Sequence, residues 1–363
     1  MAIFISIFIV YIVVISLYAL YSSARTLAKP KQVSYEKGAE QKVLVIVPCK
    51  GIDITLTENL RSIANQSYRN FRAVAVVDSD HDKAIGSIKA AGLDWIVTSK
   101  RFNKGSGKVN ALTTAINRFR GHEIYVFADS DITARKDWLS NLVAPLSQPD
   151  VGLSSTFPFF VPMGGFWSDV KSVWGLVGIG MMESETLRFG WGGSLAFRSG
   201  LLDTEDLEEF SKTVSDDIAI TSIVKKKGLK MAYVSEAAPM VRCRETFSTF
   251  FEWANRQTAL SIRGNITVFW AGIIISVMDT ALLVSGVVLG FLYSWFAFLL
   301  LAPFAMHTYR NFERVKGSPA RSVLINAMMP LMFLINLIVA KQTTSITWRG
   351  REYKLRQDLG DKR

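Results

Sequence analysis

Three long apolar segments constrain this chain more than any other feature, because they lie toward its two ends and leave a polar stretch between them. Residues 3–20 form an uncharged apolar run, residues 266–306 carry one charged residue, Asp279, and residues 323–340 form a third apolar block. A membrane-spanning helix needs about 20 apolar residues, so these segments predict one, two and one spans, respectively. Residues 42–263 have ordinary polarity and are predicted to form a globular domain.

The N-terminal segment, residues 1–24, is predicted to be an uncleaved membrane anchor. No basic residue precedes its apolar run, which is longer than the roughly 7–15 residues usual in a signal peptide. Ser22-Ser23-Ala24 would make a poor cleavage site, so a signal peptide stays open as the alternative. Arg25, Lys29 and Lys31 follow the run, and the positive-inside rule then predicts an integral membrane protein with its globular domain in the cytoplasm.

The net charge of +11 raises the question of a nucleic-acid partner. No helix-turn-helix, zinc-finger or RNA-binding signature is present in the sequence. Basic residues beside the apolar segments explain the charge better, as cations that meet anionic lipid headgroups. They are Arg310, Arg314, Lys316, Arg321, Lys341, Arg349, Arg351, Lys354 and Arg356. The sequence therefore predicts a lipid bilayer, and not nucleic acid, as a partner.

Short apolar runs alternate with helical patterns in the globular part. Strands are predicted at residues 43–47, 73–77, 95–97 and 124–128, with helices at 56–63, 83–91, 109–119 and 138–146. This alternation is typical of a mostly parallel sheet with helices on both faces. No Gly-x-Gly-x-x-Gly follows the first strand, which disfavours a dinucleotide-binding fold.

Aspartates end two of the predicted strands and are expected at one edge of the sheet. Asp78 follows the second strand, and Asp129-Ser130-Asp131 follows the fourth. Two carboxylates at i and i+2 suit a hard divalent cation that keeps open positions for substrate phosphates. Ligands of open α/β sheets bind at the carboxyl ends of the strands, so a nucleotide-sugar is one fitting ligand. A solvated turn is the alternative interpretation.

Two glycine-containing segments and one apolar segment have more than one interpretation. Residues 105–108 lack the Walker spacing, but their amides and Lys104 or Lys108 suit a diphosphate as well as an ordinary helix start. Residues 163–182 are predicted as a helix, either in the core or at the membrane interface. Trp191, Gly192 and Gly193 belong to a tight turn that also permits close approach of a ligand.

Asp216 and Asp217 open a predicted helix at residues 218–224. Acidic residues in a first helical turn are ordinary caps, and adjacent carboxylates also suit a general base. Trp253 and Arg256 precede the long apolar block. They are predicted either to anchor the chain at the membrane surface or to close over a diphosphate.

Taken in order, these motifs resemble a family 2 inverting glycosyltransferase of the ceramide glucosyltransferase type. The resemblance rests on residues 48–53, with the pattern Pro-x-Lys-Gly-x-Asp, and on three acidic motifs represented by Asp78, by Asp129-Ser130-Asp131 and by Asp217. The tail at residues 346–353 also resembles that of the family. In the fourth motif Arg256 is kept but its flanking residues differ, which disfavours a processive polysaccharide synthase.

The resemblance implies a UDP-sugar-dependent hexosyltransferase, family 2/21-like, with a GT-A-like α/β fold and transmembrane helices at both ends. It implies Asp217 as general base, Asp129 and Asp131 as ligands of Mg²⁺ or Mn²⁺, and an acceptor such as ceramide. Nucleotide-sugar binding is assigned to Pro48, Lys50, Asp53, Asp78, Lys108, Asp129 and Arg256. The acceptor side is assigned to Trp191, Gly192, Gly193, Asp216 and Trp253. No obligate protein partner is implied.

Several alternatives stay open at this point. The sugar is glucose or N-acetylglucosamine, and the lipid is ceramide, diacylglycerol, a sterol-like or hopanoid lipid, or a polyprenyl phosphate. A polysaccharide synthase and a non-catalytic transporter or scaffold, the latter suggested by Asp279, are rival functions. Membrane segments are predicted within residues 264–340 and a basic tail at 341–363. Four spans would put this tail opposite the globular domain, unless residues 323–340 are re-entrant or interfacial, or residues 266–306 cross an odd number of times.

Overall fold

A computed structural model describes residues 2–27, 41–99, 105–312, 319–348 and 350–355 of the 363-residue chain. Several basic residues considered above lie outside these ranges, namely Lys29, Lys31, Lys104, Arg314, Lys316, Arg349 and Arg356.

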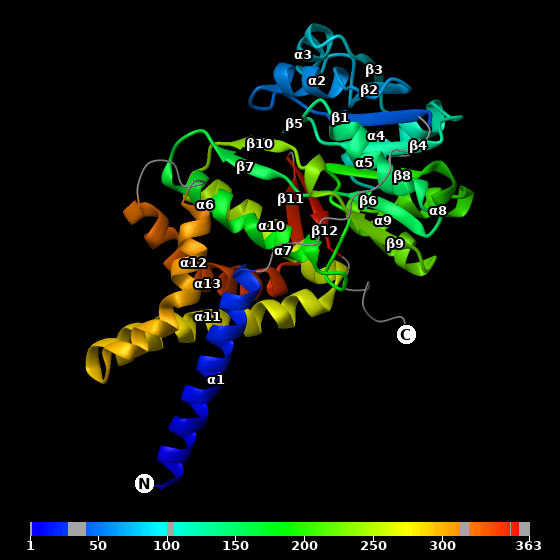
Figure 1. Cartoon of the computed structure of the whole chain (residues 1–363). Helices are drawn as coiled ribbons and strands as arrows, with labels where there is room; N and C mark the ends of the chain where they lie inside the picture. Colours follow the sequence, from blue (N-terminus) through cyan, green and yellow to red (C-terminus); the bar gives the residue numbers. More distant parts are fainter. Residues whose placement is uncertain (1, 28–40, 100–104, 313–318, 349, 356–363) are drawn as a thin grey trace.

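The globular domain is built around a seven-stranded sheet (Figure 1). Its strands in spatial order are β3 (Asp94–Val97), β2 (Phe71–Val77), β1 (Val43–Cys49), β4 (Ile124–Ala128), β8 (Ser194–Arg198), β6 (Val151–Ser155) and β9 (Lys230–Tyr233). Among these strands β8 alone runs antiparallel to its neighbours. The predicted α/β fold with a mostly parallel sheet is therefore confirmed.

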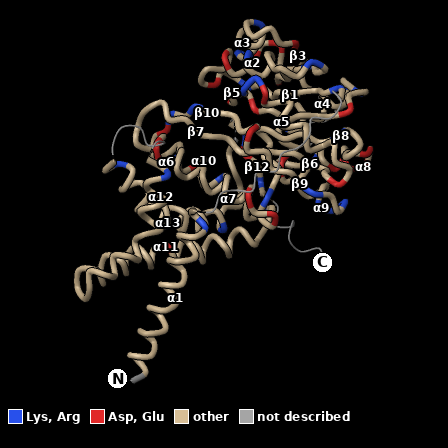
Figure 2. Tube along the Cα trace, in the orientation of Figure 1, with Lys and Arg blue, Asp and Glu red and all other residues tan. Residues whose placement is uncertain are grey.

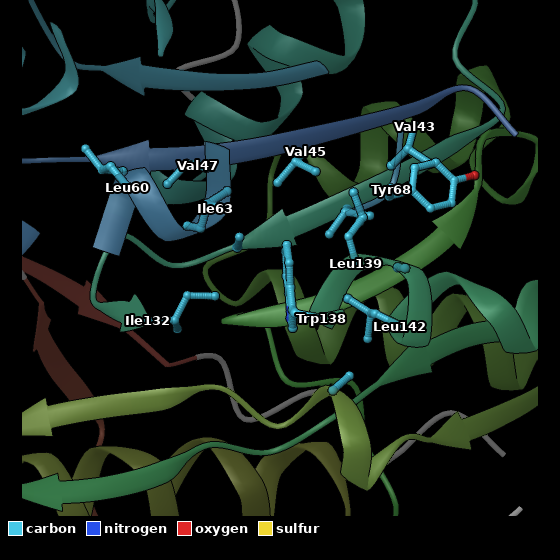
Figure 3. Packing of buried hydrophobic residues seen from close by; sticks show 14 of the residues in the cluster. Val43, Val45, Val47, Leu60, Ile63, Tyr68, Ile132, Trp138, Leu139 and Leu142 are labelled. Carbon is cyan, nitrogen blue, oxygen red and sulfur yellow. The ribbon is translucent and has the colours of Figure 1, made fainter. Parts of the chain in front are cut away.

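Helices cover both faces of this sheet, because successive strand residues point to opposite sides. Val43, Val45 and Val47 pack toward α2 (Leu56–Ala64), α3 (Ile85–Ala90) and α5 (Trp138–Val143), and Figure 3 shows this packing around Trp138. Leu44 and Ile46 face the opposite layer, formed by α4 (Gly107–Arg118), α8 (Thr204–Phe210) and α9 (Asp216–Lys226). Burial on both sides explains why the sequence of β1 is continuously apolar.

A second, smaller sheet was not predicted. It consists of β5 (Ile132–Thr133), β10 (Met240–Cys243) and β7 (Phe159–Pro162), in that order. Its strands are two to four residues long and pair residues far apart in the chain, so no local pattern marks them. Short 3-10 helices occur at Ala144–Ser147, Ser199–Leu201 and Ser235–Ala237.

The helix predicted at residues 163–182 is two helices, α6 (Phe166–Trp174) and α7 (Leu176–Glu183). They separate at Gly175, where a Cβ would lie 2.7 Å from Cε2 of Phe160, so the chain passes this ring only because the residue is glycine. The first helix begins late because Gly164 and Gly165 have φ angles of 109° and 87°. Such left-handed backbone is incompatible with a helix.

Among the described residues, three helices are long and apolar enough to cross a membrane. They are α1 (over Ile3–Leu27), α11 (Ile266–Leu292) and α13 (Pro319–Gln342). The whole of α1 spans Ala2–Leu27, and in Figure 1 it extends away from the globular domain. Figure 2 shows Lys, Arg, Asp and Glu gathered on the globular part, while α1 and α11 are almost free of them. These features are compatible with the predicted membrane protein, with apolar helices at both ends of the chain.

The block predicted to give two spans contains a single helix of that length, α11. After it come a 3-10 helix (Trp295–Leu301) and a ten-residue helix, α12 (Ala302–Asn311). The 3-10 helix lies back along α11, because the ring of Phe298 sits where a Cβ on Gly290 would be, and Leu301 lies against Gly286 in the same way. The return segment is thus shorter and less regular than predicted.

The last long helix, α13, packs along the globular domain from end to end. Arg321 at its start donates to Asp169 of α6 at 2.8 Å. Asn336 near its end accepts from Trp174 of α6 at 3.1 Å and donates to Asn255 of α10 (Phe247–Gly264) at 2.7 Å. A hairpin, β11 (Ser345–Trp348) and β12 (Arg351–Lys354), then returns to the domain. These contacts place the hairpin beside the globular domain.

Candidate active site

A cleft opens at the carboxyl ends of β1, β2 and β4. The first residues of α4 also line it. It encloses about 690 Å³, part of it open to solvent. Its lining includes predicted nucleotide-sugar or metal residues from all four elements, namely Pro48, Lys50, Asp78, Lys108, Asp129 and Asp131. The parallel register of β1 with β2 and β4 brings these strand ends together. Asp78 and Asp129 therefore share one edge of the sheet, as the strand order predicted.

Asp129 and Asp131 flank Ser130 at the end of β4, and both line the cleft. Carboxylate oxygens are the ligand type that Mg²⁺ and Mn²⁺ prefer. Among the described residues no group of three or more His, Cys, Asp or Glu side chains is placed to hold a metal ion. Two carboxylates in an open cleft fit a cation that takes its remaining ligands from water and a diphosphate.

Asp53, predicted to bind the nucleotide, is not among the residues that line this cleft. Its carboxylate accepts a hydrogen bond of 2.6 Å from the hydroxyl of Ser130. Asn59 of α2 donates to the Ser130 carbonyl at 3.2 Å. These two bonds hold the turn between Asp129 and Asp131, so Asp53 helps to position this turn.

Lys108 lies buried between two carboxylates. Its Nζ is 2.7 Å from Asp129 Oδ1 and 3.2 Å from Asp216 Oδ2. Burial acts to lower the pKa of Lys108, but the carboxylates of Asp129 and Asp216 outweigh it and hold that pKa above its usual value. Burial raises the pKa of Asp216 to about 6, against the Lys108 ammonium and with the help of the Asp217 and Asp129 carboxylates. Lys108 is therefore a fixed positive charge beside the predicted metal ligands.

The turn at residues 191–193 leaves room for the Lys108–Asp216 ion pair, because Gly192 has no side chain. A Cβ on Gly192 would lie 2.9 Å from Lys108 Nζ and would also collide with the Asp216 carboxylate. A Cβ on Gly193 would lie 2.6 Å from Cε2 of the Trp191 indole. The Gly193 carbonyl also accepts a hydrogen bond of 3.1 Å from the Asp129 amide. The turn thus fixes the position of Asp129 while making room for its partner lysine.

A second pocket, of about 1110 Å³, lies between α7, α9, α10 and the start of α11. Most of its lining is apolar, including Phe157, Met181, Trp191, Leu260 and Val268, and Asp217 is the acidic residue in that lining. The Asp217 carboxylate accepts from the Ser215 hydroxyl and, at 2.8 Å, from the Ile218 amide. We call this the apolar pocket; it lies where the globular domain meets α11.

Three residues assigned to the substrates, Asp216, Trp253 and Arg256, line neither the cleft nor the apolar pocket. Asp216 was assigned to the acceptor side, but its contact is with Lys108. Trp253 belongs to an aromatic cluster, with its ring centroid 4.9 Å from that of Trp174, and does not line the apolar pocket. Arg256 donates to the Thr347 carbonyl of the hairpin at 3.5 Å and does not line the cleft.

Two residues of the cleft were missed by the sequence analysis. Arg351 and Tyr353, both on β12, line it beside Asp78 and Gly107. Arg351 had been assigned to lipid headgroups because it follows an apolar segment, yet its guanidinium lies 3.3 Å from Asp78 Oδ2. The sole sequence signal was the resemblance of residues 346–353 to a family tail, which assigns no role to either side chain.

Comparisons with solved structures give distant similarities. A mannosyltransferase from Pyrobaculum calidifontis, solved with GDP-Man and Mn²⁺, is 18% identical with a TM-score of 0.47, over 93% of this chain and 85% of that chain. Glucosyl-3-phosphoglycerate synthase from Mycobacterium tuberculosis, solved with Mn²⁺ and UDP-glucose, is 16% identical with a TM-score of 0.41, over 62% and 79%. Both scores lie below 0.5. Among curated proteins no relative matches the chain.

A sequence profile gives the firmer assignment, because it covers nearly the whole chain, from residue 5 to residue 360. Its description is glycosyl transferase family 21. The match confirms the predicted enzyme, a hexosyltransferase with a GT-A-like fold, and it refines the resemblance from family 2 to family 21. It also overturns the alternative of a non-catalytic transporter or scaffold. The chain belongs to glycosyl transferase family 21.

Proposed function

We propose that this glycosyltransferase moves a sugar from a UDP-sugar to the hydroxyl group of a membrane lipid, with inversion at the anomeric carbon. One observation carries the proposal: the consecutive residues Asp216 and Asp217 serve two different sites. Asp216 pairs with Lys108 behind the polar cleft, and Asp217 lines the apolar pocket. A charged donor and an apolar acceptor would therefore meet at the start of α9.

In the polar cleft, Asp129 and Asp131 would hold Mg²⁺ or Mn²⁺. The cation would neutralise charge on the diphosphate leaving group. Lys108, positioned by Asp129 and Asp216, adds a fixed positive charge next to that group. Lys50 lies 3.1 Å from Asp78 at the mouth of the cleft, where the pair would contact the nucleoside. Asp53 would act through Ser130, to which it is hydrogen-bonded.

The reaction would be a single displacement with Asp217 as general base. The Asp217 carboxylate takes the proton of the lipid hydroxyl, and the hydroxyl oxygen forms a bond to the anomeric carbon. The bond between that carbon and the phosphate oxygen breaks at the same time, and the nucleoside diphosphate leaves with the electron pair. Ser215 and the Ile218 amide hold the carboxylate in place. General-base catalysis of this kind contributes about 10²–10⁴-fold.

The apolar pocket supports a lipid acceptor. It is bounded by α7 and by the start of α11, a helix long and apolar enough to cross a membrane. A lining that is mostly apolar is typical of pockets that bind apolar ligands. Glucose is proposed as the sugar and ceramide as the acceptor, because the family 2/21-like motifs resemble those of the ceramide glucosyltransferase type.

The same proposal covers the arrangement in the cell. An anchor at residues 1–24 and membrane segments within 264–340 would hold the globular domain, residues 42–263, at the cytoplasmic face. The basic tail, residues 341–363, would lie on that face as well. Support comes from Arg25, which follows the anchor, and from the hairpin contacts between the tail and the globular domain. Nothing in the described residues favours a polysaccharide synthase.

The test uses detergent-solubilised enzyme with radiolabelled UDP-glucose or UDP-N-acetylglucosamine and a panel of lipids: ceramide, diacylglycerol, a hopanoid-like lipid and a polyprenyl phosphate. We expect a labelled glycolipid from UDP-glucose and ceramide when Mn²⁺ is present. EDTA should abolish the product and fresh Mn²⁺ should restore it, because the diphosphate otherwise leaves without charge neutralisation. A labelled product that is insensitive to EDTA would contradict the metal assignment, and transfer solely to water would contradict the lipid acceptor.

A further inference from the structure

The C-terminal hairpin forms a wall of the polar cleft, although it lies more than 200 positions after the strands that build the cleft. It consists of β11 and β12 and follows directly after α13. In Figure 1 the hairpin lies between the large sheet and the layer of apolar helices. The proposed function gives this segment no role in binding the donor or in the reaction.

Two side chains on one face of β12 reach the cleft. Arg351 lies 3.3 Å from Asp78 Oδ2, and its other terminal nitrogen is 3.1 Å from the position of a Cβ on Gly107. The Tyr353 hydroxyl oxygen accepts a hydrogen bond of 3.3 Å from the Gly107 amide. Because side chains alternate along a strand, Glu352 and Lys354 lie on the opposite face, and both are exposed. The hairpin thus presents an arginine and a phenol to the strand ends and to the start of α4.

The hairpin is held in place mainly by α10. Arg263 of α10 donates to the Thr343 carbonyl, and Arg256 donates to the Thr347 carbonyl at 3.5 Å. Leu355, which follows β12, donates through its amide to the Thr344 carbonyl at 2.8 Å and packs on the apolar cluster of α10 and α13. The position of Arg351 is therefore determined by the helices on which the lipid substrate is proposed to dock.

Arg351 is better placed than Lys108 to bind a diphosphate, because fewer carboxylates neutralise its charge. Lys108 is buried between two carboxylates. The side chain of Arg351 is 45% exposed, and among the described residues it makes one ion pair, through one nitrogen. A guanidinium has five N–H donors in a planar fork that matches phosphate oxygens in pairs. The Tyr353 hydroxyl oxygen accepts a hydrogen bond from the Gly107 amide. The O–H of Tyr353 therefore stays available to donate to a phosphate oxygen in the cleft.

We propose that Arg351 is a donor-binding residue that contacts the diphosphate of the nucleotide-sugar, and that the Tyr353 hydroxyl supports this contact from the same strand. The inference rests on the proposed function and adds a C-terminal, hairpin-borne residue to the donor site. Asp78 then holds the guanidinium at the mouth of the cleft until the phosphate oxygens bind it. The hairpin is in this view part of the donor site and not a headgroup-binding tail.

The test measures the affinity of full-length enzyme in detergent for UDP with Mn²⁺ by calorimetry, together with KM for UDP-glucose and for the lipid. The variants are R351A, R351K and Y353F, and K354A is the matched control on the opposite face of the hairpin. A charged hydrogen bond lost from a phosphate predicts a rise of about 10- to 100-fold in Kd for UDP and in the donor KM of R351A. R351K should recover part of this loss, because it keeps the charge without the planar fork.

Three results separate this inference from its alternatives. R351A should leave the lipid KM and the weaker binding of uridine unchanged, and K354A should match the wild type throughout. Kd for UDP within about twofold of wild type in folded R351A, or in folded R351K if the alanine variant unfolds, would overturn the inference. An equal loss for uridine and UDP would also overturn it, since Arg351 would then hold the nucleoside. Failure of the wild type to bind UDP or transfer sugar would instead refute the proposed function.

Discussion

At the scale of single residues, the pair Asp216-Asp217 shows how two identical neighbours take different surroundings. Successive residues of a helix point about 100° apart, so one carboxylate faces the buried Lys108 and the next faces the apolar pocket. The sequence predicted an acidic pair at a helix start, with Asp217 as general base and Asp216 on the acceptor side. Which carboxylate meets the lysine depends on the rotation of α9 against α4, and no local pattern reports that rotation.

The raised pKa of Asp216 has a measurable consequence for stability. The pKa of this carboxyl is about 6 in the folded protein and about 4 in the unfolded chain. The folded protein therefore keeps the proton to a higher pH than the unfolded chain does. The contribution of this group to stability is therefore present below about pH 4 and is lost as the pH rises to about 6. In EDTA, the Tm of the wild type minus that of Asp216→Asn should fall across this interval and then level off. A difference that does not change between pH 4 and pH 7 would contradict the buried pair.

At the scale of elements, the turn between α7 and β8 connects the two proposed substrate sites. Gly192 approaches Lys108 and Asp216, Gly193 approaches Trp191, and Trp191 lines the apolar pocket. The sequence predicted close backbone approach at this turn, though toward a ligand. The structure shows that the approach is to side chains of the protein itself.

Substituting Gly192 by alanine tests this element directly. The added Cβ would meet the Lys108–Asp216 pair, so we expect Gly192→Ala to be destabilised by about 1–3 kcal/mol and to lose most of its transfer activity. Gly200→Ala is the matched control, because a Cβ there has no atom within 4 Å. Thermal unfolding and the rate of glycolipid formation would be measured for both variants. Full activity in Gly192→Ala would mean that the pair tolerates displacement.

The order of strands and helices up to β4 was predictable because each element there is local. A buried strand such as β1 is one apolar run, and its partner helices carry their own spacing. The sheet of β5, β10 and β7 was not predictable, since its strands are very short and pair across more than 70 positions. Gly175 was visible in the sequence, but its ability to divide one predicted helix depends on the distant ring of Phe160.

At the scale of the whole molecule, the C-terminal third holds the globular domain and the apolar helices together. The helix α13 contacts α6 at its start and α10 near its end, and the hairpin after it reaches Asp78. The sequence indicated long apolar segments correctly but left the side of the tail undecided. That side depends on contacts between residues such as Arg351 and Asp78, 273 positions apart, which hydropathy does not report.

This arrangement predicts that the tail and the globular domain lie on one side of the membrane. Tags would be placed at the C-terminus and at Gly121, a loop glycine with a φ of 91°. In sealed vesicles of one orientation, a protease should reach both tags or neither, because the hairpin packs on the domain. A third tag at the N-terminus should be protected when the others are cut, since α1 is long enough to cross. Opposite protection of the first two tags would contradict the packing of the hairpin on the globular domain.

In the proposed reaction, Asp217 in the apolar pocket activates a lipid hydroxyl beside the polar donor cleft. The most direct measurement is the single-turnover rate of sugar transfer to lipid by Asp217→Asn, with UDP affinity measured on the same preparation. Asp150→Asn, which removes an exposed carboxylate paired with Lys230, is the control. We predict a rate about 10²–10⁴-fold lower for Asp217→Asn, with unchanged affinity for UDP and a normal control. A transfer rate close to that of the wild type would contradict the account.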